Sequence, residues 1–301
     1  MMMAGPRRLF RRCMSSATTA RKTDYSPYLT EKSLRRKPSA IRALQPLLSI
    51  PGMISLGGGM PNSATFPFES ISVALKGGNG SFDIAGDALD GALQYSGTLG
   101  IPSLRTHLQE LQRREHGVDF ESGGSDIYIS TGSQDALAKT FDMLLDENRS
   151  LLVEEYTYSG SLAYLQPLGC HLEPIKCDSG GLIPGALDGR LEAWADGSDA
   201  PLPRVLYTIP TGSNPTGISM DEGRRRALYD VCCKHDLLII EDDPYRFLEF
   251  GSARTPSLLS MDTDGRVLRF DSFSKLISSG LRLGFCTPTR ANAHRGLQAL
   301  I

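Results

Sequence analysis

The sequence has neither an excess of positive charge nor a long apolar run. Its 301 residues include 32 Lys and Arg against 34 Asp and Glu, which gives a formal net charge of −2. This balance provides no bulk positive field for nucleic acid. No apolar run approaches the ~20 residues that a membrane-spanning helix requires. We therefore expect neither nucleic acid nor a membrane as a partner, and the composition is that of one large or two ordinary globular domains.

Metal-binding spacings are also absent from the sequence. The six cysteines include no C-x-x-C pair, and the five histidines include no H-E-x-x-H arrangement. Both spacings are typical of metal or redox sites. We therefore predict no metal site, and free thiols in a reducing compartment.

The first residues differ in composition from the rest of the chain. Residues 1–23 contain six basic residues, and no acidic residue precedes Asp24. An acid-free segment rich in Arg, Ser and Thr is typical of an organelle transit peptide, whereas a secretory signal needs an apolar core. We interpret residues 1–23 as a mitochondrial targeting segment. A plastid transit peptide, or a disordered basic tail on a cytoplasmic protein, is the alternative.

The remaining chain divides into an arm and a large α/β region. Residues 24–62 are rich in Pro, Ser and Gly and read as an extended N-terminal arm with one short helix, whereas residues 63–301 read as a large domain. From residue 125 onward, β-rich apolar runs alternate with helical patterns, which favours a mostly parallel sheet covered on both faces. The run of arginines at 224–226 is interpreted as a solvated helix face. Strands are predicted at 126–130, 150–155, 171–177, 204–210, 237–242, 266–273 and 281–287, and helices at 133–146, 159–168 and 219–236.

A lysine and an acid each follow one of these predicted strands. Lys275 lies close to Ser272, Ser274 and Arg282 in DSFSKLISSGLRLGF. A lysine that is desolvated or near another cation can act as a nucleophile near neutral pH, and the serines and arginine can hold an anion such as phosphate. Asp242 ends the run LLIIED, where an acid can hold a protonated ring nitrogen. A solvated lysine and a turn-capping acid are the structural alternatives.

Two loops add possible ligand-binding groups. The segment 210–217, PTGSNPTG, is a rigid loop after a strand, and Asn214 offers an amide donor from it. Ser133 and Gln134 begin a predicted helix after Gly132, where free backbone N–H groups can bind phosphate. By themselves these segments could equally be a turn and an ordinary helix cap.

Five motifs follow predicted strands in a fixed order: GSQDAL, YSG, SNPTG, EDDPY and SFSK…GLRLGF. Together they resemble the fold-type-I aminotransferases of class I/II, which depend on pyridoxal phosphate. The resemblance runs from about Ser39 to the C-terminus. The longer stretches KPSAIRAL, ISLGGGMPNSATFPF, ALQYSGTLGIPSLR and IIEDDPYRFLEF are most similar to the kynurenine/2-aminoadipate aminotransferases and their fungal aromatic relatives. The resemblance implies transfer of the amino group of 2-aminoadipate, kynurenine or an aromatic L-amino acid to 2-oxoglutarate.

The same resemblance assigns roles to individual residues. Lys275 would attach the cofactor covalently and carry a proton, Asp242 would pair with the ring nitrogen, and Tyr158 would stack on the ring. Asn214 and Tyr245 would donate to the ring oxygen. The residues expected to hold the phosphate are Ser133, Gln134, Ser272, Ser274 and Arg282.

The resemblance also implies a second subunit and a substrate-closing arm. Tyr95 would reach the phosphate site of the other subunit, so we expect a homodimer with its sites at the interface. Arg42 and the Gly58-Gly59 loop lie in the arm that closes over substrate in this subfamily. Together with Asn214, these residues are the expected substrate contacts.

Two departures from the family pattern affect the predicted activity. Tyr156 in VEEYTYSG stands where relatives usually have proline, which leaves open the backbone path to Tyr158. The chain also stops at Ile301, before the rest of the small domain and the arginine that clamps the substrate α-carboxylate in the family. For residues 1–301 we therefore expect poor solubility and transamination near background.

Three alternatives to a working transaminase follow. The first is a truncated, non-catalytic fragment that still binds the cofactor. The second is a carbon–sulfur lyase, which shares these motifs. The third is the effector domain of a GntR-type regulator, although residues 1–40 are too short for the winged helix that such a regulator needs.

We predict that residues 1–30, fused to a fluorescent reporter, direct the reporter into mitochondria. The reason is the acid-free, arginine-rich composition of the segment. A matched fusion in which Arg7, Arg8, Arg11 and Arg12 are replaced by glutamine should stay in the cytosol. Diffuse cytosolic fluorescence from the unmodified fusion would contradict the prediction.

Overall fold

The computed structural model describes residues 24–288, except residues 38, 41–43, 45–46, 48–49, 55, 57–58, 122–124, 195–197 and 252. The predicted targeting segment therefore lies outside the described residues, as do Arg42 and Gly58. Everything below concerns the part of the chain that is described.

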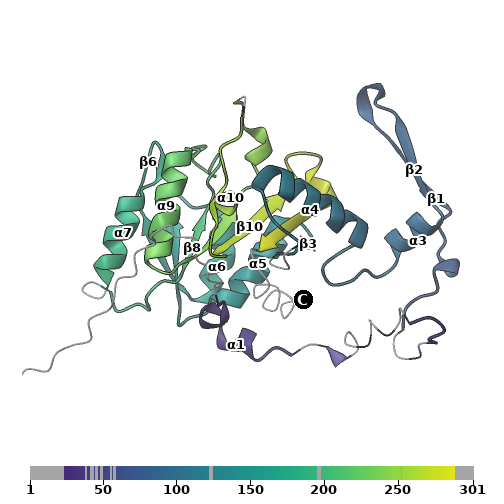
Figure 1. The fold of residues 1–301 in the computed structure, drawn as a ribbon, viewed down its shortest axis with the longest axis horizontal. Coiled ribbons are helices and arrows are strands. Elements are labelled where there is room, and N and C mark those ends of the chain that lie inside the picture. Colours follow the sequence, from purple (N-terminus) through teal and green to yellow (C-terminus); the bar gives the residue numbers. More distant parts are fainter. Residues whose placement is uncertain are drawn as a thin grey trace, which may run out of the picture.

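Seven strands form the central sheet of the described chain, in the order β3–β11–β10–β9–β8–β4–β5 (Figure 1). Strand β11 runs antiparallel to both of its neighbours, and all other neighbouring pairs are parallel. The predictions of a mostly parallel α/β sheet and of its seven strands are confirmed. The strands are β3 (Tyr128–Ser130), β4 (Ser150–Glu154), β5 (His171–Ile175), β8 (Val205–Thr208), β9 (Leu238–Asp242), β10 (Val267–Ser272) and β11 (Gly284–Pro288).

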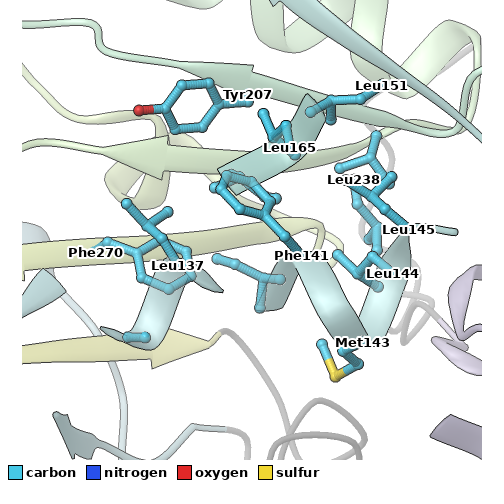
Figure 2. Close-up of a cluster of buried hydrophobic side chains, with 14 of the residues drawn as sticks. Leu137, Phe141, Met143, Leu144, Leu145, Leu151, Leu165, Tyr207, Leu238 and Phe270 are labelled. Carbon is cyan, nitrogen blue, oxygen red and sulfur yellow. The ribbon is translucent and has the colours of Figure 1, made fainter. Parts of the chain in front are cut away.

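One face of the sheet packs against helices α5 (Ser133–Leu144) and α6 (Ser159–Leu165), which confirms two of the predicted helices. Phe141 of α5 is fully buried and packs edge-on against the ring of Tyr207, with centroids 5.6 Å apart (Figure 2). Every second residue of the central strands, such as Ile240 and Phe270, joins this cluster. This period of two is expected for strands that bury both faces.

The opposite face packs against α9 (Glu222–Lys234), the third predicted helix, and against three helices that were not predicted. Ile239 and Val267, which alternate with Ile240 and Phe270, belong to this second cluster. Burial on both faces explains why β9 reads as a continuous apolar run rather than an alternating one. The three further helices are α4 (Pro102–His116), α7 (Pro184–Glu192) and α10 (Leu258–Met261).

The start of the described chain packs on the sheet. Tyr25 and Tyr28 are buried in the α5/α6 cluster, and the Tyr25 hydroxyl donates to the Gly265 carbonyl at 2.9 Å. The Arg149 guanidinium donates to the Tyr28 and Leu29 carbonyls. The short helix α1 (Glu31–Leu34) follows, so this part of the arm is anchored to the large sheet.

Several elements lie apart from the central sheet. The antiparallel hairpin of β1 (Ser70–Ala74) and β2 (Ser81–Ala85) extends away from it, followed by α3 (Asp87–Leu93) (Figure 1). A second small pair, β6 (Cys177–Asp178) and β7 (Gly181–Leu182), lies beside α9. The hairpin exposes large apolar side chains, including Phe82, along with Phe68 just before it.

We predict that Gly284→Ala destabilises the chain. A Cβ at this position would lie 2.4 Å from the Ser133 amide nitrogen and 2.6 Å from the Gly132 carbonyl carbon. These are backbone atoms, so β11 or the start of α5 must move, and we expect a loss of about 1–3 kcal/mol in the free energy of unfolding, measured in urea.

The matched control for this variant is Gly189→Ala in α7. Gly189 is exposed, and nothing lies within 4 Å of an added Cβ there. Alanine in an open helical position should leave stability unchanged or raise it by up to ~1 kcal/mol. Equal effects of the two substitutions would rule out the close approach of β11 to α5.

Candidate active site

A cleft of about 250 Å³ lies where the strands β8, β9 and β10 end at their carboxyl termini. This edge of a parallel sheet is where α/β proteins bind their ligands. Ten of the residues predicted from the sequence line the cleft: Ser133, Gln134, Tyr158, Asn214, Asp242, Tyr245, Ser272, Ser274, Lys275 and Arg282.

One end of the cleft is suited to an anion. Helix α5 begins there at Ser133, and its cap residue Gly132, with φ of 89°, places no side chain over the first free amides. The guanidinium of Arg282 lies so close that a Cβ on Gly132 would be 2.6 Å from its Nη2. Backbone amides at a helix start, combined with a guanidinium, form a binding site for phosphate.

The other end contains a buried carboxylate. Asp242 ends β9 and is only 4% exposed. Its Oδ2 accepts a hydrogen bond of 2.8 Å from the Tyr207 hydroxyl, which in turn accepts one of 2.9 Å from Ser161. The second oxygen, Oδ1, is also buried and has no hydrogen-bond partner among the described residues. A buried oxygen left without a donor is a place where a ligand's N–H group fits.

Burial changes the titration of Asp242. Loss of solvation is the main cause that raises its pKa from 3.8 to about 7, and the Tyr207 hydrogen bond acts in the opposite direction. The carboxylates of Asp243 and Asp271 raise the pKa further, and Arg269 lowers it. A cationic ligand group beside Oδ1 would stabilise the charged form and lower the pKa.

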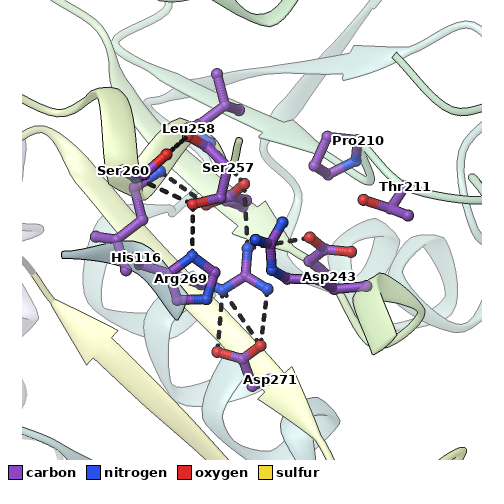
Figure 3. A network of polar contacts seen from close by, with 12 residues as sticks. His116, Pro210, Thr211, Asp243, Ser257, Leu258, Ser260, Arg269 and Asp271 are labelled. Carbon is purple, nitrogen blue, oxygen red and sulfur yellow. Dashed lines mark hydrogen bonds and ion pairs between the residues drawn. The ribbon is translucent and has the colours of Figure 1, made fainter. Parts of the chain in front are cut away.

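A network of buried ionic groups lies on the opposite face of the same strands (Figure 3). Arg269 is fully buried and forms ion pairs of 3.2, 3.0 and 2.8 Å with Glu241, Asp243 and Asp271. Glu241 also accepts hydrogen bonds from the Leu258 and Leu259 amides. Burial of charge requires such pairing, and here it fixes the end of β9 immediately beside Asp242.

The loop that carries Asn214 is held by two buried charged residues. The Glu154 carboxylate accepts hydrogen bonds from the Thr208 hydroxyl, the Ile209 amide and the Ser213 hydroxyl, at 2.6, 2.9 and 3.0 Å. Burial raises its pKa. From the other side, Arg225 donates to the Pro210 carbonyl and the Thr211 hydroxyl.

The interpretation of the arginines at 224–226 as a solvated face is therefore wrong for Arg225. Its side chain is fully buried, and it donates to the Met220 and Pro256 carbonyls in addition to the Asn214 loop. A run of three arginines on a helix indicates charge on more than one face, because successive residues lie about 100° apart. The run alone does not show which member points inward.

The remaining cleft residues lie in four loops, each of which follows a strand of the central sheet. Tyr158 is the cap residue of α6, and its ring lies against Gly160, where an added Cβ would be 2.5 Å from the ring. Tyr156, which stands where relatives usually have proline, is exposed. Tyr158 nevertheless lines the cleft. The Asn214 amide donates to the Tyr245 hydroxyl at 3.4 Å, and Lys275 is solvent-exposed.

Two other predicted residues that the structure describes, Tyr95 and Gly59, do not line the cleft. The side chain of Tyr95 is 76% exposed after α3, and Gly59 is exposed with nothing within 4 Å of a Cβ added there. Arg42 and Gly58 fall outside the described residues. The roles of these four residues stay predictions.

Sequence reasoning missed several residues at the site. Ile209, Pro244 and Ser279 line the cleft, and Tyr207 and Ser161 lie behind Asp242. Pro244 lies in the motif EDDPY and Ser279 lies in SFSKLISSGLRLGF, so the motifs around them already indicated a position near the site. The indication for Tyr207 was weaker: it is a residue with a polar hydroxyl in the otherwise apolar strand RVLYTIP.

The described ranges contain no group of three or more His, Cys, Asp or Glu side chains that could hold a metal ion. None of their helices combines the length and apolar character needed to cross a membrane.

Comparison with known proteins decides the family. The model of the family "Aminotransferase class I and II" matches residues 54–300. The chain belongs to this family. The mitochondrial kynurenine/alpha-aminoadipate aminotransferase of Rattus norvegicus is 43% identical over 283 residues, which cover 90% of this chain and 66% of the rat protein.

Solved structures of aminotransferases agree with this assignment. The crystal structure of aminotransferase Aro8 from Candida albicans superposes with a TM-score of 0.83 at 31% identity, over 93% of this chain and 66% of that one. LysN, the alpha-aminoadipate aminotransferase of Thermus thermophilus, gives a TM-score of 0.60 at 31% identity, over 71% and 52%. The chain thus spans slightly less than two-thirds of the length of the rat and Candida relatives.

The cleft fits the cofactor of this family, pyridoxal phosphate. Asp242 Oδ1 is the buried acceptor that a protonated ring nitrogen requires, and the start of α5 with Arg282 supplies the anion site that a phosphate requires. Lys275 lines the same cleft and supplies a primary amine. The family and this donor set together indicate pyridoxal phosphate as the cofactor.

We predict that Asp242 makes the cofactor-free chain less stable as the pH rises. The folded-state pKa of about 7 lies above the ordinary 3.8, so the folded state holds a proton that the unfolded state has lost. The stability is therefore full below pH 4 and falls between pH 4 and 7, by about 4 kcal/mol at 1.36 kcal/mol per pKa unit.

Asp242→Asn should remove this dependence. The measurement is the free energy of unfolding of the cofactor-free wild type and of the variant in urea from pH 4 to pH 9. The variant should become the more stable of the two as the pH approaches 7. Parallel curves over the whole range would contradict the raised pKa.

Proposed function

We propose that this protein is a pyridoxal-phosphate-dependent transaminase that moves the amino group of an L-amino acid to 2-oxoglutarate. The observation that carries the proposal is the buried, unpaired Oδ1 of Asp242 in a cleft whose other end is an anion site. A ring cation and a phosphate on one ligand would satisfy both ends together.

The substrate class is inferred from the relatives. The rat protein is named for kynurenine and alpha-aminoadipate, and LysN is named for alpha-aminoadipate and was crystallised with N-(5′-phosphopyridoxyl)-L-leucine. A Dictyostelium discoideum relative at 36% identity is named as an aromatic amino acid aminotransferase. We therefore propose 2-aminoadipate, kynurenine or an aromatic amino acid as the amino donor.

The residues of the cleft would divide the work of the reaction. Bound pyridoxal phosphate supplies an electron sink that stabilises negative charge at the substrate Cα. Asp242 would hold the ring nitrogen in its charged form, and Arg282 with the α5 amides would hold the phosphate. Tyr158 would cover the ring face, and Asn214 and Tyr245 would donate to the ring oxygen.

Lys275 would have two tasks in this scheme. Its Nζ would hold the cofactor covalently, and the same amine would carry a proton to and from the substrate Cα. Four further residues line the same cleft and are proposed as additional donors to the phosphate: Ser133, Gln134, Ser272 and Ser274.

We also propose a mitochondrial homodimer. The composition of residues 1–23 and the mitochondrial names of the rat and mouse relatives support the location. The exposed side chain of Tyr95 is available to a second subunit, where it would reach the phosphate. Arg42 and the Gly58-Gly59 loop are proposed to close over the substrate. Nothing among the described residues favours the non-catalytic fragment, the lyase or the regulator over the transaminase.

We predict that the chain binds pyridoxal phosphate covalently through Lys275. Mixing the two should produce the absorbance band of the bound cofactor, and borohydride should fix the label on a peptide that contains Lys275. Lys275→Ala should show neither, because this amine is the one that lines the cleft.

The control for this experiment is Lys139→Ala. Lys139 lies on α5, where it donates to the Tyr128 hydroxyl and Asp135 outside the cleft lining. That variant should label as the wild type does. A label mapped to Lys139 or Lys234 in the wild-type chain would refute the proposed role of Lys275. The loss of the bound-cofactor band on adding kynurenine or 2-aminoadipate then tests the first half of the transamination.

A further inference from the structure

The carboxylate of Asp242 is the end of a chain of hydroxyl groups that runs into the protein core. Ser161 on α6, Tyr207 on β8 and Asp242 on β9 are joined by hydrogen bonds of 2.9 and 2.8 Å. Their exposed fractions are 0%, 1% and 4%. Water therefore does not compete with either hydrogen bond.

The direction of both hydrogen bonds is fixed by chemistry. An ionised carboxylate only accepts, so the Tyr207 hydroxyl must donate to Asp242 Oδ2. The Tyr207 oxygen can then accept from the Ser161 hydroxyl, whose own proton is directed at it. Hydrogen bonds in such a chain strengthen one another in a low dielectric. The Tyr207 ring is also held in place by its edge-on contact with Phe141.

This arrangement distinguishes the two oxygens of the carboxylate. Oδ2 is occupied by Tyr207, whereas Oδ1 is buried without a partner among the described residues. A freely rotating carboxyl would present either oxygen, and a protonated one would present a donor rather than an acceptor.

We infer that Ser161 and Tyr207 are positioning residues that hold Asp242 by Oδ2, so that Oδ1 stays available as an ionised acceptor for the ring nitrogen of the cofactor. The inference rests on the proposed function for the identity of the ligand. It assigns no direct contact with substrate or cofactor to either hydroxyl residue.

The charges around Asp242 show why the Tyr207 donor matters. On the opposite face of the sheet, Arg269 is already paired with Glu241, Asp243 and Asp271. Asp243 and Asp271 raise the pKa of Asp242, and Arg269 lowers it. Within the cleft, Lys275 and Arg282 line the same cavity. Tyr207 is the hydrogen-bond donor that acts on the carboxylate directly.

The chain offers a matched control at Tyr164. Its hydroxyl also donates to an aspartate, Asp142, at 3.0 Å, and its ring also packs on Phe141, with centroids 6.2 Å apart. Tyr164 does not line the cleft. Tyr164→Phe thus removes the same type of hydrogen bond from the same hydrophobic cluster without affecting Asp242.

The first measurement is the equilibrium dissociation constant of pyridoxal phosphate for the 301-residue chain. Tyr207→Phe should weaken binding about tenfold, because it removes a hydrogen bond to a charged group. Ser161→Ala should weaken binding by a smaller factor, and Tyr164→Phe by less than twofold. In an Asp242→Asn background, Tyr207→Phe should have less than a twofold effect, since its action passes through the charged carboxylate.

The second measurement uses the cofactor-free chain and does not depend on the proposed function. The free energy of unfolding is measured against pH for each protein and for its Asp242→Asn derivative. The difference between the two curves changes slope at the folded-state pKa of Asp242. For the wild type the change should occur near pH 7. For Tyr207→Phe it should move upward by about one pH unit, and for Ser161→Ala in the same direction.

The outcomes separate the two proposals. If the slope change moves as expected but no variant binds pyridoxal phosphate, the hydroxyl chain acts on Asp242 and the proposed function fails. If the cofactor binds but Tyr207→Phe weakens it equally with Asp242 or Asn at position 242, the inference is overturned. An equal loss of cofactor affinity in Tyr164→Phe would likewise overturn the inference, because the loss would then come from general destabilisation of the hydrophobic core. Should Tyr207→Phe not fold, Ser161→Ala tests the same shift.

Discussion

A single buried carboxylate, that of Asp242, sets the requirements that the surrounding structure meets. Removing an ionised group from water is expensive unless hydrogen bonds or opposite charges compensate. Here Tyr207 supplies the hydrogen bond on one oxygen, and the other oxygen has no partner among the described residues. A cationic group on a ligand would pair with this second oxygen and complete the compensation of the buried charge.

The pleat of β9 separates this acid from its two acidic neighbours. Glu241 and Asp243 point to the face opposite Asp242, where Arg269 pairs with both and with Asp271. Three successive acids at the end of one strand would repel each other on a single face. Their alternation lets one acid serve the cleft, while the other two fix the strand and the start of α10.

Much of this arrangement could be predicted from the sequence because the chemistry follows the strands. Parallel strands place the residues at the ends of their apolar runs along one edge of the sheet. Four site residues stand at or just after such ends: Ser133, Asn214, Asp242 and Lys275. The antiparallel direction of β11 could not be predicted, since an apolar run does not encode direction. Tyr207 and Arg225 were missed or misread because their roles depend on contacts between segments far apart in the chain.

The two ends of the cleft differ in the groups that would bind a charged ligand. At the acid end, Asp242 is buried, and one oxygen of its carboxylate accepts a hydrogen bond from Tyr207. The anion end uses backbone amides and the exposed Arg282, whose φ of 52° and ψ of 45° place a non-glycine residue in the left-handed region. That conformation costs roughly 1–2 kcal/mol, and it directs the guanidinium to the start of α5, where it donates to the Thr131 carbonyl. Strain of this kind persists only where the surrounding structure enforces it. Two residues after Arg282, Gly284 packs closely on the backbone of Gly132 and Ser133. The phosphate end is thus shaped by backbone geometry, and the ring end by side-chain hydrogen bonding, so that substitutions at the two ends should affect cofactor binding through different physical terms.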